Sequence, residues 1–171
     1  LADFVAEQTG IAFDEYLRQA VFEPLGMSSS VLAGSAGHAA RSTVADLLRF
    51  VAELLDPHLI SAQTHAEATT VQFPGSNGVL PGFGSQRPND WGLGFEIRNG
   101  KSPHWTGATN SPRTYGHFGQ SGTFLWVDPE IRVGCVALSD ENFGDWARRG
   151  WPPFSDAVIA ETTRSQDTAA K

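Results

Sequence analysis

The sequence predicts an α+β fold with an antiparallel sheet, because helix-like segments come first, strand-like segments follow, and a helix-like segment closes the chain. Apolar residues recur at helical spacing in three segments of the first third: 1–8, 13–22 and 43–55. Later, the apolar stretches 123–127 and 131–138 flank the turn sequence 128–130, and this pattern predicts a β-hairpin. Flanking helices on an antiparallel sheet are therefore the expected architecture.

The first 70 residues are predicted to form part of a helical region. Gly10 is a natural end for the first helix, and Thr43 with Asp46 forms a capping pattern before another helix. Ser61 is expected to cap a short helix that reaches about Thr70. The segment 28–41 between these helices is rich in Ser, Gly and Ala, and it is expected to be a loop that exposes His38.

The rest of the chain divides into a loop, 71–90, and a sheet region with a C-terminal helix, 91–171. Residues 91–97 carry large side chains at alternate positions and predict a strand. Both faces of 131–138 are apolar, which predicts a central strand covered on both sides. The last helix is expected to start at Pro152-Pro153, because proline fits the first turn, and to fray over 162–171. Together the three parts make one domain.

Composition excludes several classes of protein. The chain has 171 residues, 40% hydrophobic and 18% charged, which is typical of a globular protein. A formal net charge of −7 disfavours nucleic acid as the main partner, and no apolar run is long enough to span a membrane. The single cysteine, Cys135, lies in an apolar strand and excludes an internal disulfide or a cysteine-built metal site. His58 and His65 lack metal-ligand spacing, so no metal is expected.

The segment 115–122, with the sequence Tyr-Gly-His-Phe-Gly-Gln-Ser-Gly, is the candidate functional stretch. It surrounds His117, which can move protons near neutral pH, with glycines that let a ligand approach the backbone closely. One interpretation is the rim of an active site, and the other is a glycine-rich strand edge with a structural histidine. Ser121 resembles half of a nucleophile elbow, but a strand follows it instead of a helix. A hydrolase that uses Ser121 with His117 therefore remains a rival hypothesis.

The order of four segments resembles the serine β-lactamase and penicillin-binding-protein-like hydrolases, a group that includes class C β-lactamases, D-alanyl-D-alanine peptidases and esterases. The four segments are Phe-Glu-Pro-Leu-Gly-Met at 22–27, Ser-Thr-Val-Ala-Asp-Leu at 42–47, Trp-Gly-Leu-Gly-Phe at 91–95, and Gly-His-Phe-Gly at 116–119 leading to Trp-Val-Asp-Pro at 126–129. The resemblance runs from 1 to about 159 and is strongest to actinobacterial members. It implies the C-terminal part of a β-lactamase/transpeptidase-like fold.

The resemblance also implies site residues. That family has a Lys-Thr-Gly motif, replaced by His-x-Gly in many esterase-like members, and the matching residues here are His117, Phe118 and Gly119. Catalytic roles then fall to His117, Gly119 and Gln120, whose backbone N–H would form half of an oxyanion hole. Phe118 and Ser121 are expected to contact the substrate.

Two family motifs are absent. No Ser-x-x-Lys nucleophile motif and no family-like Tyr-x-Asn occur in the sequence, and the residues at 39–41 are Ala-Ala-Arg where relatives have Gly-Gly-Leu. We therefore expect the nucleophile to precede Leu1 in the intact protein or to come from a separate piece, so that this chain alone is not catalytic.

The resulting hypothesis is that the chain is the C-terminal fragment of a serine hydrolase. The whole hydrolase would act through an acyl-serine on an ester, peptide or lactam carbonyl. The expected partners are a small-molecule or peptide substrate and the complementary N-terminal part of the same protein, with an oligomer also possible. No cofactor is implied, and the compartment stays open between the cytoplasm and the cell envelope. The alternative is a non-catalytic binding module derived from this fold.

Overall fold

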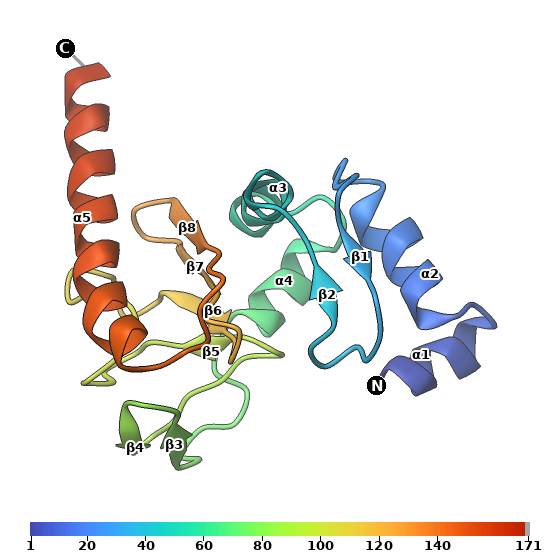
Figure 1. Cartoon of the computed structure of the whole chain (residues 1–171), viewed down its shortest axis with the longest axis horizontal. Helices are drawn as coiled ribbons and strands as arrows, with labels where there is room; N and C mark the ends of the chain where they lie inside the picture. The colour runs from blue at the N-terminus through green and yellow to red at the C-terminus, as the bar shows by residue number, and fades with distance from the viewer. Residues whose placement is uncertain (170–171) are drawn as a thin grey trace.

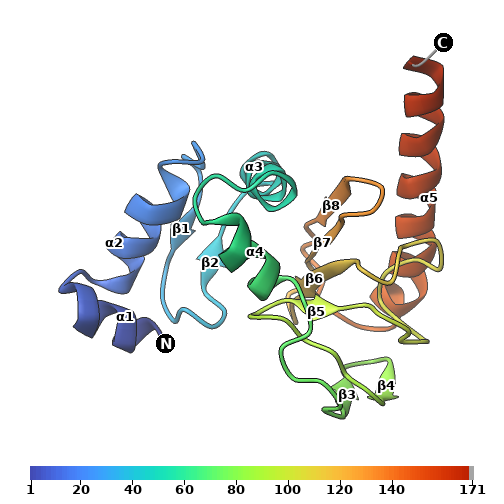
Figure 2. The same cartoon turned by 180° about the vertical axis from the view of Figure 1, so that it is seen from behind.

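The computed structural model describes residues 1–169 and places the helices of the first part beside the sheet of the second. The first part contains α1 (Ala2–Thr9), α2 (Phe13–Leu17), the π-helical turn η1 (Arg18–Phe22), α3 (Val44–Leu55) and α4 (Ala62–Ala68). Figures 1 and 2 show these helices on one side and the sheet with the long helix α5 (Asp145–Ala169) on the other. No helix in the described range is long and apolar enough to cross a membrane.

The predicted helix boundaries of the first part are confirmed. Gly10 ends α1 in the left-handed conformation, with φ of 69°. The Thr43 side chain accepts a hydrogen bond from the Asp46 N–H at 3.2 Å, and Ser61 accepts one from the Thr64 N–H at 3.0 Å. His38 is exposed, as expected.

The expected antiparallel sheet is also confirmed. It contains four strands in the order β5 (Glu96–Ile97), β6 (Tyr115–Phe118), β7 (Phe124–Asp128) and β8 (Val133–Ala137), and every neighbouring pair is antiparallel. The register places Gly116 opposite both Glu96 on β5 and Trp126 on β7. Successive side chains along each strand point to opposite faces of the sheet.

Each face of the sheet has its own buried core. The face toward α3 packs an apolar cluster of Val51, Leu54, Ile97, Tyr115 and Val127. The opposite face packs a larger cluster, rich in aromatic residues, against α5, which includes Trp105, Phe124, Trp126, Cys135, Ala147 and Trp151. Cys135 is thus a buried apolar side chain, as expected, and burial raises its pKa to about 11.

Two segments expected as loops contain short hairpins. Within 28–41, β1 (Val31–Leu32) pairs with β2 (Ala40–Arg41), and within 71–90, β3 (Gly78–Leu80) pairs with β4 (Gly84–Gln86). These strands have two or three residues each, which is too short for an alternating apolar pattern to be visible in the sequence. The β3–β4 hairpin projects from the sheet region (Figure 1).

The strand predicted over 91–97 is mostly wrong, because only Glu96–Ile97 is a strand. Gly94 has φ of 86°, and the Gly92 N–H donates to the Phe95 carbonyl at 2.8 Å, so the chain bends here. A Cβ at position 92 would lie 2.1 Å from the Ala68 carbonyl oxygen, so a glycine is required where this bend meets the end of α4.

The predictions for the last strand and helix are partly wrong. Among the described strands β8 is the last in the sheet order, not central, and its two apolar faces are explained by α3 on one side and α5 on the other. Helix α5 starts at Asp145 instead of Pro152 and continues through both prolines to Ala169. The fraying predicted for 162–171 is therefore not seen as far as Ala169, and the last two residues lie outside the described range. Ala147 and Trp151 are buried in the core, and this packing offsets the backbone hydrogen bonds that the prolines cannot donate.

A buried polar cluster fixes the loop that follows β5. The Glu96 carboxylate accepts hydrogen bonds from Lys101 Nζ, from His104 Nε2 at 2.9 Å and from Trp105 Nε1 at 2.7 Å. Lys101 Nζ also donates to the Asp90 carbonyl at 2.9 Å. All these side chains are almost fully buried, so the cluster ties β5 to the segment before Trp91.

The ionisation states in this cluster follow from its contacts. Burial lowers the pKa of His104 below its ordinary value of 6.5 and outweighs the Glu96 carboxylate, which acts the other way. The Thr106 N–H donates to His104 Nδ1 at 3.1 Å, consistent with a neutral ring that carries its proton on Nε2. Burial opposes ionisation of Glu96, but the hydrogen bonds and charges of His104 and Lys101 outweigh it and lower the pKa of Glu96 below 4.5.

We predict that the chain loses stability on acidification from about pH 6.5 downward. The unfolded chain binds a proton at His104 more readily than the folded chain does, and below pH 4.5 the same holds for Glu96. Urea unfolding at pH 8, 6 and 5 measures the free energy of unfolding. His104→Gln should flatten its decline between pH 8 and 5, and His38→Gln, at an exposed site, should not. An equal decline in the His104 variant would contradict this account.

Candidate active site

His117 lies where the helices stop covering the sheet. It faces the same side of β6 as Tyr115, whose hydroxyl donates to the Leu54 carbonyl at the end of α3 at 3.0 Å. Burial raises the pKa of Tyr115 to about 12, so its hydroxyl remains a donor. His65 also bonds the Leu54 carbonyl, at 2.9 Å, and therefore has a structural role, as expected. Two residues further along β6, His117 is exposed.

The His117 imidazole has an aromatic neighbour but no hydrogen-bond partner within residues 1–169. The ring of Trp91 lies edge-on to it, with the ring centroids 5.6 Å apart and the planes at 63°. A neutral imidazole has one donor and one acceptor nitrogen. Both nitrogens of His117 are therefore free to bind a group from outside the described chain.

The turn between β6 and β7 orients the Gln120 N–H. Inside this turn, the Gly122 N–H donates to the Gly119 carbonyl at 3.0 Å, and the Gly119 N–H donates to the Thr123 carbonyl at 2.9 Å. In a planar trans peptide the C=O and N–H point in opposite directions. With the Gly119 carbonyl turned toward Gly122, the Gln120 N–H points out of the turn, and it donates to no protein acceptor in the described chain.

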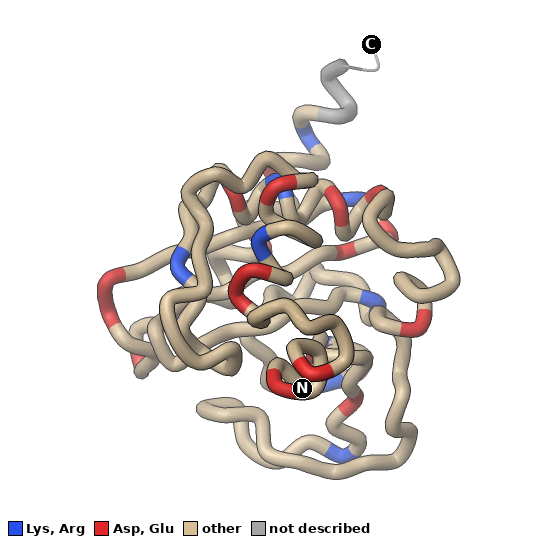
Figure 3. The backbone as a smooth tube through the Cα atoms, turned by 90° about the vertical axis from the view of Figure 1, so that its right-hand side faces the viewer, with Lys and Arg blue, Asp and Glu red and all other residues tan. Residues whose placement is uncertain are grey.

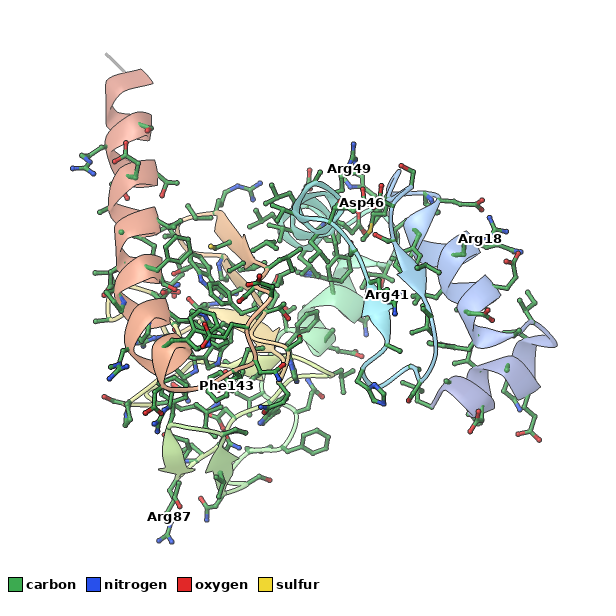
Figure 4. The ribbon with its side chains drawn as sticks, viewed as in Figure 1. Arg18, Arg41, Asp46, Arg49, Arg87 and Phe143 are labelled. Carbon is green, nitrogen blue, oxygen red and sulfur yellow. The ribbon has the colours of Figure 1, made fainter. Side chains whose placement is uncertain are left out.

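A neighbouring segment holds the turn in place. The Phe143 N–H donates to the Gln120 carbonyl at 2.9 Å. Gly122 has φ of 74°, and a Cβ there would lie 1.9 Å from the Glu141 carbonyl oxygen. The Phe143 ring lies 4.9 Å from that of Phe118 and 5.2 Å from that of Trp151, within the aromatic core at the start of α5 (Figure 4). The turn is therefore fixed by packing on the opposite face of the sheet.

The remaining predicted residues have different surroundings. A Cβ at Gly119 would come no closer than 3.3 Å to another atom, the Ser121 hydroxyl oxygen. An alanine side chain would therefore fit at position 119 after a small shift of Ser121. The Phe118 side chain packs against the core on the α5 side, so it does not share the side of β6 on which His117 lies. Ser121 is exposed, and its hydroxyl bonds Thr123 Oγ1 at 3.0 Å. Within the described residues, no hydrogen bond joins Ser121 to His117.

The sequence interpretation missed two parts of this site. The sequence places Trp91 in a predicted strand and in one of the four family-like segments but not beside His117, and it gives Phe143 no role at the turn. Their contacts with His117 and Gln120 are long-range in sequence, so no local pattern reveals them. The described residues hold no group of three or more His, Cys, Asp or Glu side chains that could bind a metal ion.

Comparison with known proteins identifies the family. The family model described as Beta-lactamase matches residues 1–158. The chain belongs to the beta-lactamase family. It is 62% identical to a beta-lactamase from Mycobacterium bovis, with a TM-score of 0.92 over 94% of this chain. A comparison with curated proteins gave no match.

More distant structures share the fold. A putative beta-lactamase from Bacteroides dorei is 18% identical with a TM-score of 0.63, and simvastatin synthase from Aspergillus terreus is 14% identical with a TM-score of 0.71. The chain covers 60% of the Mycobacterium bovis protein, 54% of the Bacteroides dorei protein and 52% of the Aspergillus terreus protein. It thus spans little more than half of the length of these beta-lactamase-like structures.

We predict that Gly122→Ala destabilises the turn by about 2 kcal/mol or more, because alanine is strained at positive φ and would overlap the Glu141 carbonyl. Gly119→Ala, in the same turn, is the matched control and should cost much less. Urea unfolding measures both values, and the Gln120 amide resonance should move more in the Gly122 variant. Equal effects of the two substitutions would contradict the proposed steric role of Gly122.

Proposed function

We propose that this chain supplies the sheet side of the active site of a serine hydrolase, which transfers the acyl group of an ester, peptide or lactam to a serine and then to water. The observation that carries the proposal is the outward Gln120 N–H, fixed by the turn, beside an unpartnered histidine. A preorganised N–H is the donor that a developing oxyanion needs in acyl transfer. Membership in the beta-lactamase family supports the same chemistry.

In the proposed reaction, the serine hydroxyl oxygen bonds to the carbonyl carbon while the carbonyl π electrons move to oxygen. The Gln120 N–H stabilises that oxyanion. When it collapses, the bond to the leaving group breaks, and the leaving group takes up the proton that the serine gave. Water then attacks the acyl-serine in the same way and releases the acid and the free serine. His117, which has no hydrogen-bond partner in the described chain, is proposed to hydrogen-bond the substrate or the leaving group during both steps.

The serine is proposed to come from the complementary N-terminal part of the same protein, since the chain has no Ser-x-x-Lys sequence. Two features support such a partner. The β8 edge has no strand beside it among the described residues, although both of its faces are packed. Val44 and Leu48 on α3, which packs against β8, and Leu138, which follows β8, are exposed apolar side chains. A strand and a helix could cover both features.

This proposal predicts where a fluorophosphonate probe reacts. The chain should be labelled neither alone nor in the assembled protein, and the label should appear on the complementary part. Intact mass spectrometry of every polypeptide locates it. A label on this chain that is lost in Ser121→Ala would contradict the proposal and favour Ser121 as the nucleophile. No label on any polypeptide of the assembled protein would favour the non-catalytic binding module.

The controls use histidines of the same chain. In the assembled protein, His117→Ala should slow ester hydrolysis by about 10²-fold or more, the range typical for loss of a proton-transfer or donor group. His38→Ala changes an exposed histidine outside the site and should leave the rate unchanged. Equal rates for the two variants would remove His117 from the proposed mechanism.

A further inference from the structure

We infer that the substrate is an uncharged ester whose apolar acyl chain lies on an apolar rim beside His117, formed by Val71, Phe73, Trp91 and Leu93. The inference rests on the proposed function, because it names the substrate class of the same site. It selects one of the three carbonyl classes that the proposed chemistry allows.

The rim is continuous with the catalytic histidine through Trp91. The Trp91 ring contacts the His117 ring, and the backbone carbonyl of Trp91 accepts a hydrogen bond from the Gln72 N–H at 2.9 Å. Val71 and Phe73 flank Gln72, so both lie beside Trp91. The Leu93 N–H donates to the Ala68 carbonyl at 2.9 Å, which holds Leu93 against the end of α4. These two backbone hydrogen bonds bring the segment 71–73 beside Trp91 and the segment 91–93 beside the end of α4.

Three of the four rim side chains are too exposed for core residues. Phe73 is 57% exposed, Leu93 is 52% exposed and Val71 is 38% exposed. An isolated exposed apolar side chain is ordinary, but a group of them beside a candidate active site indicates a binding surface.

The cations of the described chain disfavour an anionic group at this position. A substrate carboxylate is normally bound by Arg or Lys. Lys101 is buried and held by Glu96, and Arg98 is half-buried near Asp128 and Asp156. Arg87 projects from the outer end of the β3–β4 hairpin, away from the sheet (Figure 4).

The other Lys and Arg residues that the structure describes form no cationic cluster near the rim (Figure 3). Arg113 precedes β6 at the end opposite the turn at 119–122, and the Lys and Arg residues are spread along the chain without a cluster (Figure 3). Lys101, Arg98, Arg87 and Arg113 are thus each engaged or placed elsewhere, and none of them is seen to contact His117 within the described chain. A neutral acyl chain, in contrast, loses water-exposed apolar surface on this rim and gains stability.

The test compares esters of one leaving group in the assembled protein. Hydrolysis of p-nitrophenyl octanoate, acetate and hemisuccinate gives kcat/KM for a long apolar, a short and an anionic acyl group. The octanoate should be preferred over the acetate, and the hemisuccinate should be poorest. The double variant Phe73→Ser/Leu93→Ser should lower the octanoate-to-acetate ratio about tenfold or more, as removal of apolar contacts does in other pockets. Val79→Ser, which changes an exposed apolar residue on β3, is the matched control and should keep the ratio.

Several outcomes would overturn the inference. An unchanged ratio in the double variant, or a preference for the hemisuccinate, would show that the rim does not bind an apolar acyl chain. Loss of the complementary part from the double variant would assign the rim to the interface between the two parts. An equal fall for all three esters would assign it a purely structural role.

A binding measurement separates this inference from the proposed function. If the unmutated protein hydrolyses none of the esters, the proposed function fails, but the rim can still be tested in the chain alone. Addition of N-methyloctanamide should shift the NMR signal of the Trp91 indole N–H, whereas N-methylacetamide and octanoate should leave it in place. Equal shifts with all three compounds, or none with any, would refute the apolar subsite.

Discussion

The site depends on one backbone hydrogen bond, from the Gly122 N–H to the Gly119 carbonyl. That bond fixes the plane of the peptide between Gly119 and Gln120, and so it aims the Gln120 N–H away from the protein. The bond can form only because Gly122 adopts positive φ in a space that a Cβ would fill. A donor that is already aimed loses little entropy when charge develops on the substrate, and this is the basis of oxyanion stabilisation.

The two cores give that turn different supports on the two faces of the sheet. On the α5 side, Phe143 packs among aromatic rings and its N–H holds the Gln120 carbonyl. On the α3 side, the helices cover β6 only as far as Tyr115, whose hydroxyl bonds the end of α3. His117, two residues further along β6, is exposed and therefore open to a ligand. Burial on one face and exposure on the other thus place a rigid donor at an accessible edge.

The sequence predicts much of this fold and only part of the site. Caps such as Thr43 and Ser61 are local signals, and the hairpin of β7 and β8 follows from apolar stretches around a turn, so both were predictable. The early start of α5 was not, because burial of Trp151 overrides the local preference of the prolines. Likewise, His117 stands in a recognisable motif, but its contact with Trp91 joins residues 26 positions apart, which no periodicity encodes.

The structure of a phosphonate adduct of the assembled protein tests the central claim most directly. The account predicts that the phosphoryl oxygen, which stands for the oxyanion, accepts a hydrogen bond from the Gln120 N–H at about 2.7–3.1 Å. It also predicts that the bond between Gly122 and Gly119 is unchanged from the free state. A phosphoryl oxygen bound away from Gln120, with that N–H pointing to solvent, would contradict the account.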